Sequence, residues 1–149
     1  MHVLRAEKGY IIVGQETDGT ATPDDAGVGW AVAKSKRDFV GKRSLARASM
    51  TAPGRKQLVG LLTEDPHLVL EEGAQLVEDP AQPAPMTLLG HVTSSYFSAA
   101  LGHSIALAMV ADGRARMGRK LFVPMPGGAI PVQVTAPVFY DPKGVRLDA

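Results

Sequence analysis

The sequence contains no cysteine, and its charges nearly cancel. The absence of cysteine among the 149 residues excludes disulfides, iron–sulfur clusters and a thiol nucleophile, and it suits a reducing compartment. A net charge of +1 provides no general attraction to nucleic acid or to acidic membranes. No apolar run approaches the roughly 20 residues that a membrane-spanning helix needs. We therefore expect a cytoplasmic protein that binds neither nucleic acid nor membrane.

The common catalytic patterns are also missing. There is no Gly-x-Ser-x-Gly elbow and no phosphate-binding loop of the Gly-x-x-x-x-Gly-Lys-Ser/Thr type. Residues 27–29 begin like a dinucleotide fingerprint, but Val32 stands where the third glycine should be. The four histidines are too far apart for a local ligand pair, so we predict no metal site. For His91 and His103, a partly exposed strand histidine is favoured over a general base.

What the chain does contain is enough apolar sequence for one domain with a core. Hydrophobic residues make up 45% of it. Residues 105–111 are seven consecutive apolar residues between Gly102 and Asp112, a pattern that favours a strand shielded on both faces over a helix. Five hydroxyl residues fall within 93–98, and hydroxyl groups can bond back to the main chain. We interpret that stretch as a structural corner, with a ligand wall as the alternative.

Short strands recur at close spacing after residue 56, which predicts a small barrel or sandwich. The expected strands are 57–63, 74–78, 86–93, 105–111, 121–125 and 129–136. Because it contains Pro131, we expect the last of them to lie at an edge of the sheet or at a barrel seam. Before residue 56 we expect strand-like runs at 10–13 and 30–33, one helical turn at 22–26 and a short helix at 42–48. The fold class is thus mainly β with short helices (α+β), built on a Greek-key-type barrel.

A break at 51–56, rich in proline, glycine and charge, separates two parts of the chain. We predict one domain segment over residues 1–52 and a β-barrel domain over 53–149. The chain runs directly into Val3-Leu4 without a dispensable polar leader. We therefore expect that it is a piece of a longer protein whose fold begins further upstream.

Three groups of side chains are candidates for binding. Arg5 stands two residues from Glu7, and the two need not pair, so its guanidinium can present donors to a carboxylate or a heterocycle. Tyr96 and Phe97 can stack on a flat ring, although core packing is the more ordinary role. A basic cluster can bind an anion such as a glutamate tail, or simply be a solvated loop. That cluster comprises Arg114, Arg116, Arg119 and Lys120.

Four ordered motifs carry a family resemblance that covers nearly the whole chain. They are Leu4-Arg5-Ala6-Glu7-Lys8-Gly9-Tyr10, Thr22-Pro23-Asp24-Asp25-Ala26-Gly27, Asp38-Phe39-Val40-Gly41-Lys42 and the stretch 90–110. In this order they resemble the C-terminal part of the glycine-cleavage T-protein (aminomethyltransferase) family. The hydroxyl-rich 94–99, with 60–63 and 114–118, is more similar to the C-terminal end of the alpha subunits of heterotetrameric sarcosine oxidases.

The resemblance implies a function for the longer relative. Such a protein demethylates sarcosine oxidatively with FAD, FMN and NAD in the full complex, and passes the one-carbon unit to tetrahydrofolate. Residues 1–52 would be the end of the folate-binding domain, with Arg5 contacting folate and Tyr96 and Phe97 as part of the wall. The family's catalytic aspartate and the glutamate of its Tyr-Thr-Gly-Glu motif lie upstream, so we assign no catalytic residue here.

The implied partners are the other sarcosine oxidase subunits and the upstream part of the same subunit. This piece alone would be inactive and would hold part of a folate site. In the full-length protein, we expect replacement of Arg5 by alanine to weaken folate binding with little effect on stability. The alternatives are a stand-alone β-barrel binding or assembly module without catalysis, or the tail of a dimethylglycine dehydrogenase or aminomethyltransferase relative.

Overall fold

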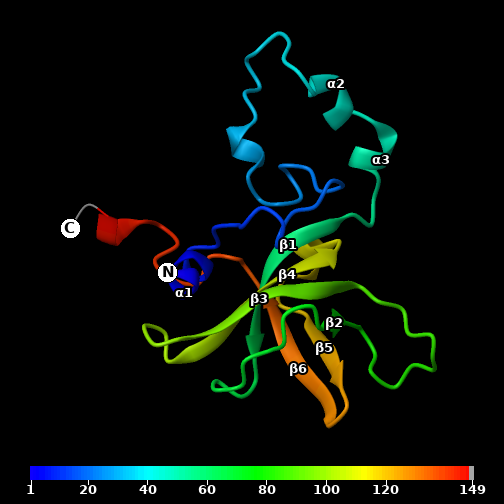
Figure 1. Ribbon diagram of the computed structural model, residues 1–149, viewed down its shortest axis with the longest axis vertical. Helices are drawn as coiled ribbons and strands as arrows, with labels where there is room; N and C mark the ends of the chain where they lie inside the picture. The colour runs from blue at the N-terminus through cyan, green and yellow to red at the C-terminus, as the bar shows by residue number, and fades with distance from the viewer. Residues whose placement is uncertain (148–149) are drawn as a thin grey trace.

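The computed structural model describes residues 1–147, which form a mainly β fold with short helices (Figure 1). The last two residues of the predicted barrel domain lie outside the described part. The strands are β1 (Lys56–Thr63), β2 (Gln75–Leu76), β3 (Gly90–Ser98), β4 (His103–Ala111), β5 (Lys120–Met125) and β6 (Gly128–Thr135). The helices are α1 (His2–Glu7), η1 (Gly29–Ala31), α2 (Lys42–Leu45), α3 (Ala48–Thr51), η2 (Gly113–Arg116) and η3 (Val145–Leu147).

The strands form one antiparallel sheet in the order β2-β3-β4-β1-β6-β5. Three consecutive strands, β2 to β4, are followed in space by β1, which is the Greek-key arrangement. A bridge between Val77 and Phe122 then joins the two ends of the sheet, with backbone hydrogen bonds of 2.9 and 3.0 Å. The predicted fold class, mainly β around a Greek-key-type barrel, is confirmed.

Strand β4 is buried on both faces, as its unbroken apolar run predicts. Ala106, Ala108 and Val110 face the barrel interior, where they pack with residues of the other strands. The alternate residues, Ile105 and Leu107 among them, belong to a second cluster outside the barrel that includes Ala6 of α1. Because successive side chains of a strand point to opposite faces, β4 contributes to two separate cores.

The hydroxyl-rich stretch is part of strand β3, and the prediction of a corner there is wrong. The strand runs on through residue 98, and the turn falls at 99–102. A bulge at Thr93 shifts the register, and the Thr93 hydroxyl donates to the Leu107 carbonyl at 3.1 Å. The other hydroxyls bond to groups outside the sheet: Ser94 and Ser98 donate to Glu16 and Glu7 of the N-terminal part, and Ser95 accepts from the Leu70 amide. The expected start at 86 is also wrong, since β3 begins at Gly90.

Two runs that look like strands in the N-terminal part are not strands. Residues 10–12 have no regular secondary structure, and Val13 makes a single bridge to Thr17. The Ile12 amide donates to Glu16 instead of to a neighbouring strand. Residues 30–33 carry part of the 3-10 helix η1, and within residues 1–147 no strand pairs with them. A strand needs a partner for its backbone groups, and an apolar run does not supply one.

The helical predictions before residue 56 are closer to the structure. Residues 22–26 form one hydrogen-bonded turn, in which the Ala26 amide donates to the Thr22 carbonyl at 3.1 Å. Gly27 follows in the left-handed region with φ of +74°, where glycine is favoured. The helix expected at 42–48 is shorter than predicted, because α2 ends at Leu45 before a second turn begins at Ala48.

Pro131 lies where β6 has a neighbour on only one side. The pairing of β6 with β1 ends at Val132, while its pairing with β5 continues through Pro131 opposite Phe122. The strand is internal to the sheet, but the position is locally an edge, as the missing N–H of proline requires.

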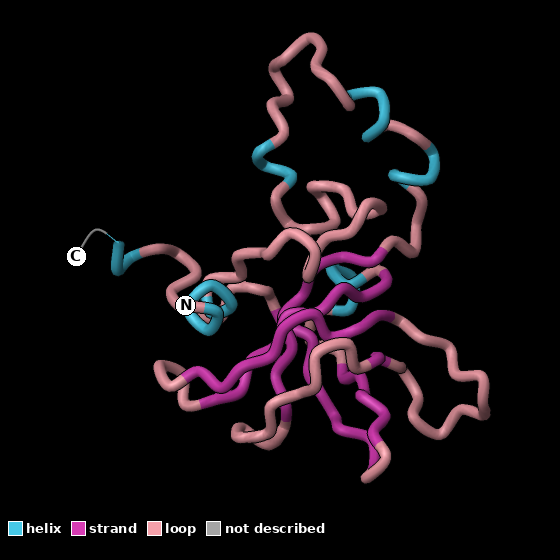
Figure 2. Tube along the Cα trace, viewed as in Figure 1, coloured by secondary structure: helices cyan, strands magenta, loops and turns pink. Residues whose placement is uncertain are grey.

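The N-terminal part divides into two pieces around the barrel (Figure 2). Helix α1 lies against β3 and β4. The segment that carries η1, α2 and α3 projects away from the sheet, at the top of Figures 1 and 2. Within residues 1–147, no helix has the length and apolar character needed to span a membrane.

Candidate functional site

Helix α1 places Arg5 over strand β3, where its side chain is only 11% exposed. One guanidinium nitrogen lies 3.0 Å from the carboxylate of Glu16. The other donates to the Ser94 hydroxyl at 2.5 Å. The Glu16 side chain is fully buried, so this ion pair is inside the protein, beneath α1. A carboxylate, one of the two kinds of partner considered for Arg5, is thus supplied by the chain itself.

Glu16 is held by three donors. Besides Arg5, the Ser94 hydroxyl donates to one of its oxygens at 2.5 Å and the Ile12 amide to the other at 2.7 Å. Burial by itself raises the pKa of Glu16, but these hydrogen bonds and the charge of Arg5 outweigh it and lower the pKa below the usual 4.5. The same pair raises the pKa of Arg5 although burial opposes this, so both groups are charged at neutral pH.

The outer end of this cluster is open to solvent. The Tyr96 hydroxyl lies 3.4 Å from the second terminal nitrogen of Arg5 and donates to Glu72 at 3.3 Å. The Gln15 amide reaches the other Glu72 oxygen, also at 3.3 Å. The Arg5 guanidinium carbon is 5.8 Å from the centre of the Tyr96 ring, within range of a cation–π contact. The internal ion pair therefore continues into a polar, half-exposed rim.

Tyr96 and Phe97, predicted together as a possible wall, are separated by the strand that carries both. Tyr96 lies beside Arg5, where it joins the outer hydrophobic cluster. Phe97 is 38% exposed and stacks on His67, with ring centres 5.3 Å apart. Only Tyr96 shares a site with Arg5, because neighbouring residues of a strand face opposite ways.

A second buried ion pair fastens the N-terminal part to the barrel. Asp25, which is 4% exposed, accepts from the Thr22 amide at 2.8 Å and hydroxyl at 2.7 Å. Arg55, just before β1, donates to the same carboxylate and to the Thr20 carbonyl. Burial raises the pKa of Asp25, but the bonds from Arg55 and Thr22 outweigh it, so the pKa is lowered.

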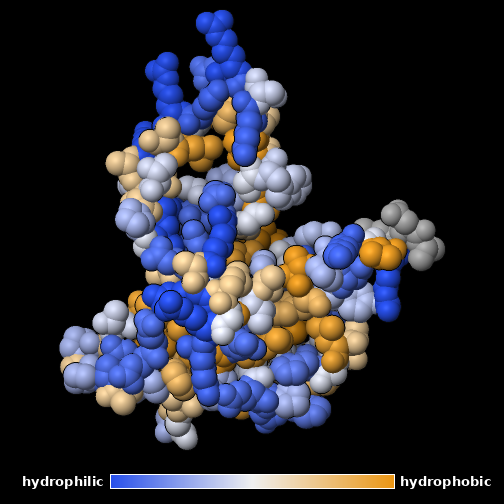
Figure 3. All heavy atoms as spheres, turned by 180° about the vertical axis from the view of Figure 1, so that it is seen from behind, coloured by the Kyte–Doolittle hydropathy of each residue, from blue (hydrophilic) through white to orange (hydrophobic). Residues whose placement is uncertain are grey.

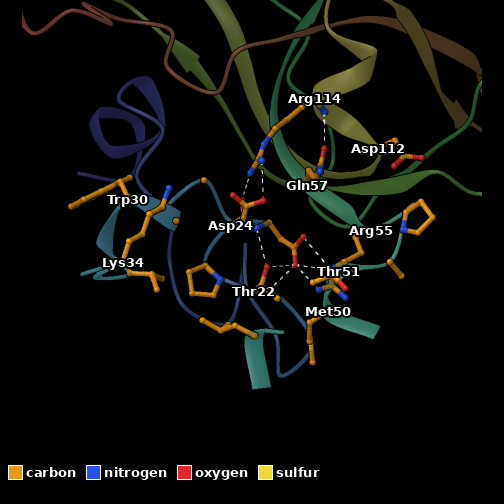
Figure 4. Close-up of a pocket in the computed structure, with 18 residues that line it drawn as sticks. Thr22, Asp24, Trp30, Lys34, Met50, Thr51, Arg55, Gln57, Asp112 and Arg114 are labelled. Carbon is orange, nitrogen blue, oxygen red and sulfur yellow. Dashed lines mark hydrogen bonds and ion pairs between the residues drawn. The ribbon is translucent and has the colours of Figure 1, made fainter. Parts of the chain in front are cut away.

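A cleft of about 850 Å³ opens beside this ion pair, between the projecting segment and the barrel (Figure 4). Its walls include Trp30 and Lys34 on one side and Asp112 and Arg114 on the other. Arg114 crosses to Asp24 at 3.0 Å and ties the two sides together. The cleft is separate from the cluster around Arg5, since their lining residues do not overlap.

The basic cluster of η2 and β5 is paired with carboxylates in the structure. In addition to Arg114 with Asp24, Arg116 and Arg119 lie 3.2 and 3.8 Å from Glu78. Lys120 lies 2.5 Å from Glu64. Since each cation already has an acidic neighbour, the solvated loop describes this cluster better than an anion site does.

The histidines do not assemble into a catalytic group. The His91 pKa is lowered by burial and by Lys56, and the Nδ1 of His103 lies 2.7 Å from the Ser104 carbonyl. Within residues 1–147, no group of three or more His, Cys, Asp or Glu side chains is placed to hold a metal ion.

Two buried glutamates of this region were missed by the sequence reasoning. Glu16 pairs with Ser94, and Glu7 accepts from the Ser98 hydroxyl at 2.5 Å. Both serines come from the hydroxyl-rich strand, so that strand provides a partner for each acid. The available signal was the presence of acids at positions 7 and 16 together with hydroxyl residues at 93–98.

The sequence of the barrel matches a known family. The Glycine cleavage T-protein C-terminal barrel domain matches residues 56–141. The match covers β1 to β6 and more than half of the chain, which therefore belongs to that family.

The most informative relatives are subunits of sarcosine oxidase. The chain is 52% identical to sarcosine oxidase subunit alpha of Corynebacterium sp. (strain P-1) over 152 aligned positions. It is 40% identical to the subunit alpha of Rhizobium meliloti (strain 1021). Each alignment covers 99% of this chain but 15% of the relative, so the chain spans about 15% of their length. The resemblance drawn from the motifs is confirmed.

Aminomethyltransferases are more distant relatives. The aminomethyltransferase of Nostoc sp. (strain PCC 7120 / SAG 25.82 / UTEX 2576) is 35% identical over 92% of this chain and 35% of its own length. Among solved structures, glycine cleavage system aminomethyltransferase T from Bartonella henselae matches with a TM-score of 0.78. That match has 25% identity and covers 94% of this chain and 38% of the other.

Proposed function

We propose that this chain acts as the C-terminal part of an alpha subunit of the sarcosine oxidase type. There it supplies the barrel and one wall of a tetrahydrofolate site, while the longer protein oxidises sarcosine and passes on the one-carbon unit. The observation that carries the proposal is the 52% identity over 99% of the chain to a sarcosine oxidase subunit alpha. FAD, FMN and NAD, together with the other subunits, belong to that longer assembly.

The cluster around Arg5 supports the folate part of the proposal. The Arg5 Nε is buried and has no acceptor within residues 1–147, so one donor of the guanidinium is left over. The adjacent Tyr96 is half-exposed, and its hydroxyl offers a polar group, while its ring already stacks with His2. A folate that lies beside Tyr96 would meet the Tyr96 hydroxyl at its edge. Phe97, on the other face of β3, is retained only as a more remote part of the wall.

Folate titration of two proteins tests this proposal. One is the 149-residue chain, and the other is the Corynebacterium sp. (strain P-1) subunit with its matching C-terminal region replaced by this chain. We expect the chimera to bind tetrahydrofolate and the 149-residue chain to bind it only weakly, because one wall does not enclose the ligand. Binding by the 149-residue chain as tight as by the chimera would contradict a one-wall site.

Substitutions of two neighbouring residues of β3, one as the test and one as its control, examine the contact with Tyr96. Tyr96→Phe in the chimera keeps the ring but removes the hydroxyl, whereas Phe97→Leu changes the opposite face of β3. We expect the first to weaken folate binding by roughly 5- to 10-fold, the usual loss for one hydrogen bond, and the second to have a smaller effect. Equal effects would mean that Tyr96 does not contact the ligand.

A further inference from the structure

The projecting segment 28–53 is ordered without burying any of its side chains. Every residue from 28 to 53 is at least partly exposed, and η1, α2 and α3 contain no buried residue. Fixing the backbone costs conformational entropy at every residue, which burial of apolar surface normally offsets. Within residues 1–147, the segment has its ends attached to the barrel but no core of its own.

Large apolar side chains of this segment lie on the surface. Trp30 is 83% exposed, and Val40 is completely exposed. Val40 borders a hollow of about 480 Å³ whose walls also include Val32, Phe39 and Leu45. Figure 3 shows apolar side chains gathered in the upper lobe, with long hydrophilic side chains projecting around them. A concave apolar patch of this kind marks an interaction site.

The rim of this patch is strongly basic. Residues 34–47 contain six lysines and arginines and one acid, Asp38, whereas the whole chain has a net charge of +1. In the described part of the chain, no cation of 34–47 has a carboxylate within 4 Å, in contrast to the paired cations of η2 and β5. A partner surface with acidic residues would therefore complement the charge of this rim.

We infer that residues 28–53 form a docking surface for the preceding part of a longer alpha subunit, with an apolar contact face bordered by acidic residues. This inference rests on the proposed function. The relatives hold about 85% of their length outside the matched region, so the same polypeptide contains enough additional surface. The apolar hollow fits an inserted apolar side chain of a protein better than it fits RNA. The helices, four residues each, are too short to lie along a bilayer as an amphipathic helix does.

Substitutions at exposed valines test the inference in the 149-residue chain and in the chimera. Val40→Asp removes no packing in the 149-residue chain, so we expect its thermal midpoint to be unchanged. In the chimera the same aspartate would be forced into the docked interface, and we expect a clear fall in the midpoint. Val145→Asp, at another exposed valine, is the control and should be neutral in both proteins. An equally neutral Val40→Asp in the chimera would overturn the inference.

Hydrogen exchange provides a second test in case the chimeric variant does not fold. We expect the amides of 28–53 to exchange at nearly unprotected rates in the 149-residue chain and to become protected in the unsubstituted chimera, while those of β4 are protected in both. Protection of the segment equal to that of β4 in the 149-residue chain would contradict the inference. So would tight binding of that chain to phosphatidylserine vesicles or RNA at physiological salt.

The two proposals can fail separately. A chimera that binds no folate but shows the Val40→Asp effect would reject the folate site and leave the docking surface standing. A chimera that binds folate and whose thermal midpoint is unchanged by Val40→Asp would reject the docking surface and leave the folate site standing.

Discussion

At the scale of single residues, Arg5 combines a structural role with the proposed folate contact. Its guanidinium neutralises Glu16, whose side chain is fully buried. Removing one member of a buried ion pair leaves the other charge without compensation, which is far more costly than losing an exposed pair. The expectation from the sequence alone, that the Arg5→Ala variant would retain its stability, therefore does not hold for the geometry observed.

We expect Arg5→Ala to lower the free energy of unfolding by about 3–5 kcal/mol, the usual cost of leaving a buried charge unpaired. Urea denaturation at neutral pH measures it. Arg114→Ala is the matched control, because the Arg114–Asp24 pair is 44% and 73% exposed and should contribute about 1 kcal/mol or less. Equal losses for the two variants would show that the Arg5 pair is not buried in solution.

Glu16 predicts a pH dependence of stability. Its pKa is lowered on folding, because the bonds from Ser94, Ile12 and Arg5 outweigh burial, so the unfolded chain binds its proton more readily. This contribution is complete above the unfolded pKa of 4.5 and is lost as the pH falls through the lower folded pKa. We expect Glu16→Gln to be less stable than the wild type at about pH 7, with the difference narrowing below about pH 4.5. A difference that is constant across denaturation curves over this range would contradict the assignment.

At the scale of elements, the Asp25–Arg55 pair attaches the turn at 22–26 to the start of β1. The Leu58 amide also donates to the Asp25 carbonyl at 2.8 Å, so the turn extends the hydrogen bonding of the strand. The projecting segment begins directly after this attachment. Loss of the ion pair should therefore loosen the segment and the turn while the barrel persists.

Asp25→Asn tests this attachment by hydrogen exchange. We expect the Ala26 and Leu58 amides to exchange faster by at least about tenfold, as follows from losing 1.4 kcal/mol or more of local stability, while β4 amides change little. Asp24→Asn, which alters an exposed pair, serves as the control. If β4 exchanged faster to the same extent, the pair would be part of global stability and not a local attachment.

At the scale of the whole molecule, the barrel was predictable from the sequence and the packing around it was not. The apolar run of β4 and the alternation of β6 are local signals, and both strands were found. Glu16 could not be assigned a partner from the sequence. Ser94 is 78 residues away, and the two come into contact only through the packing of the strands between them. The false strands at 10–13 and 30–33 fail for the same reason, since pairing depends on a neighbour that the local pattern does not contain. The proposed boundary between residues 52 and 53 stays a prediction.

The two buried faces of β4 belong to two separate hydrophobic clusters. Changes at Ala106, Ala108 or Val110 alter the interior of the barrel, whereas changes at Ile105 or Leu107 alter only what rests upon its outer wall. Descendants of such a domain can thus acquire a different outer covering, and with it a different neighbour, while the closed sheet inside is inherited intact.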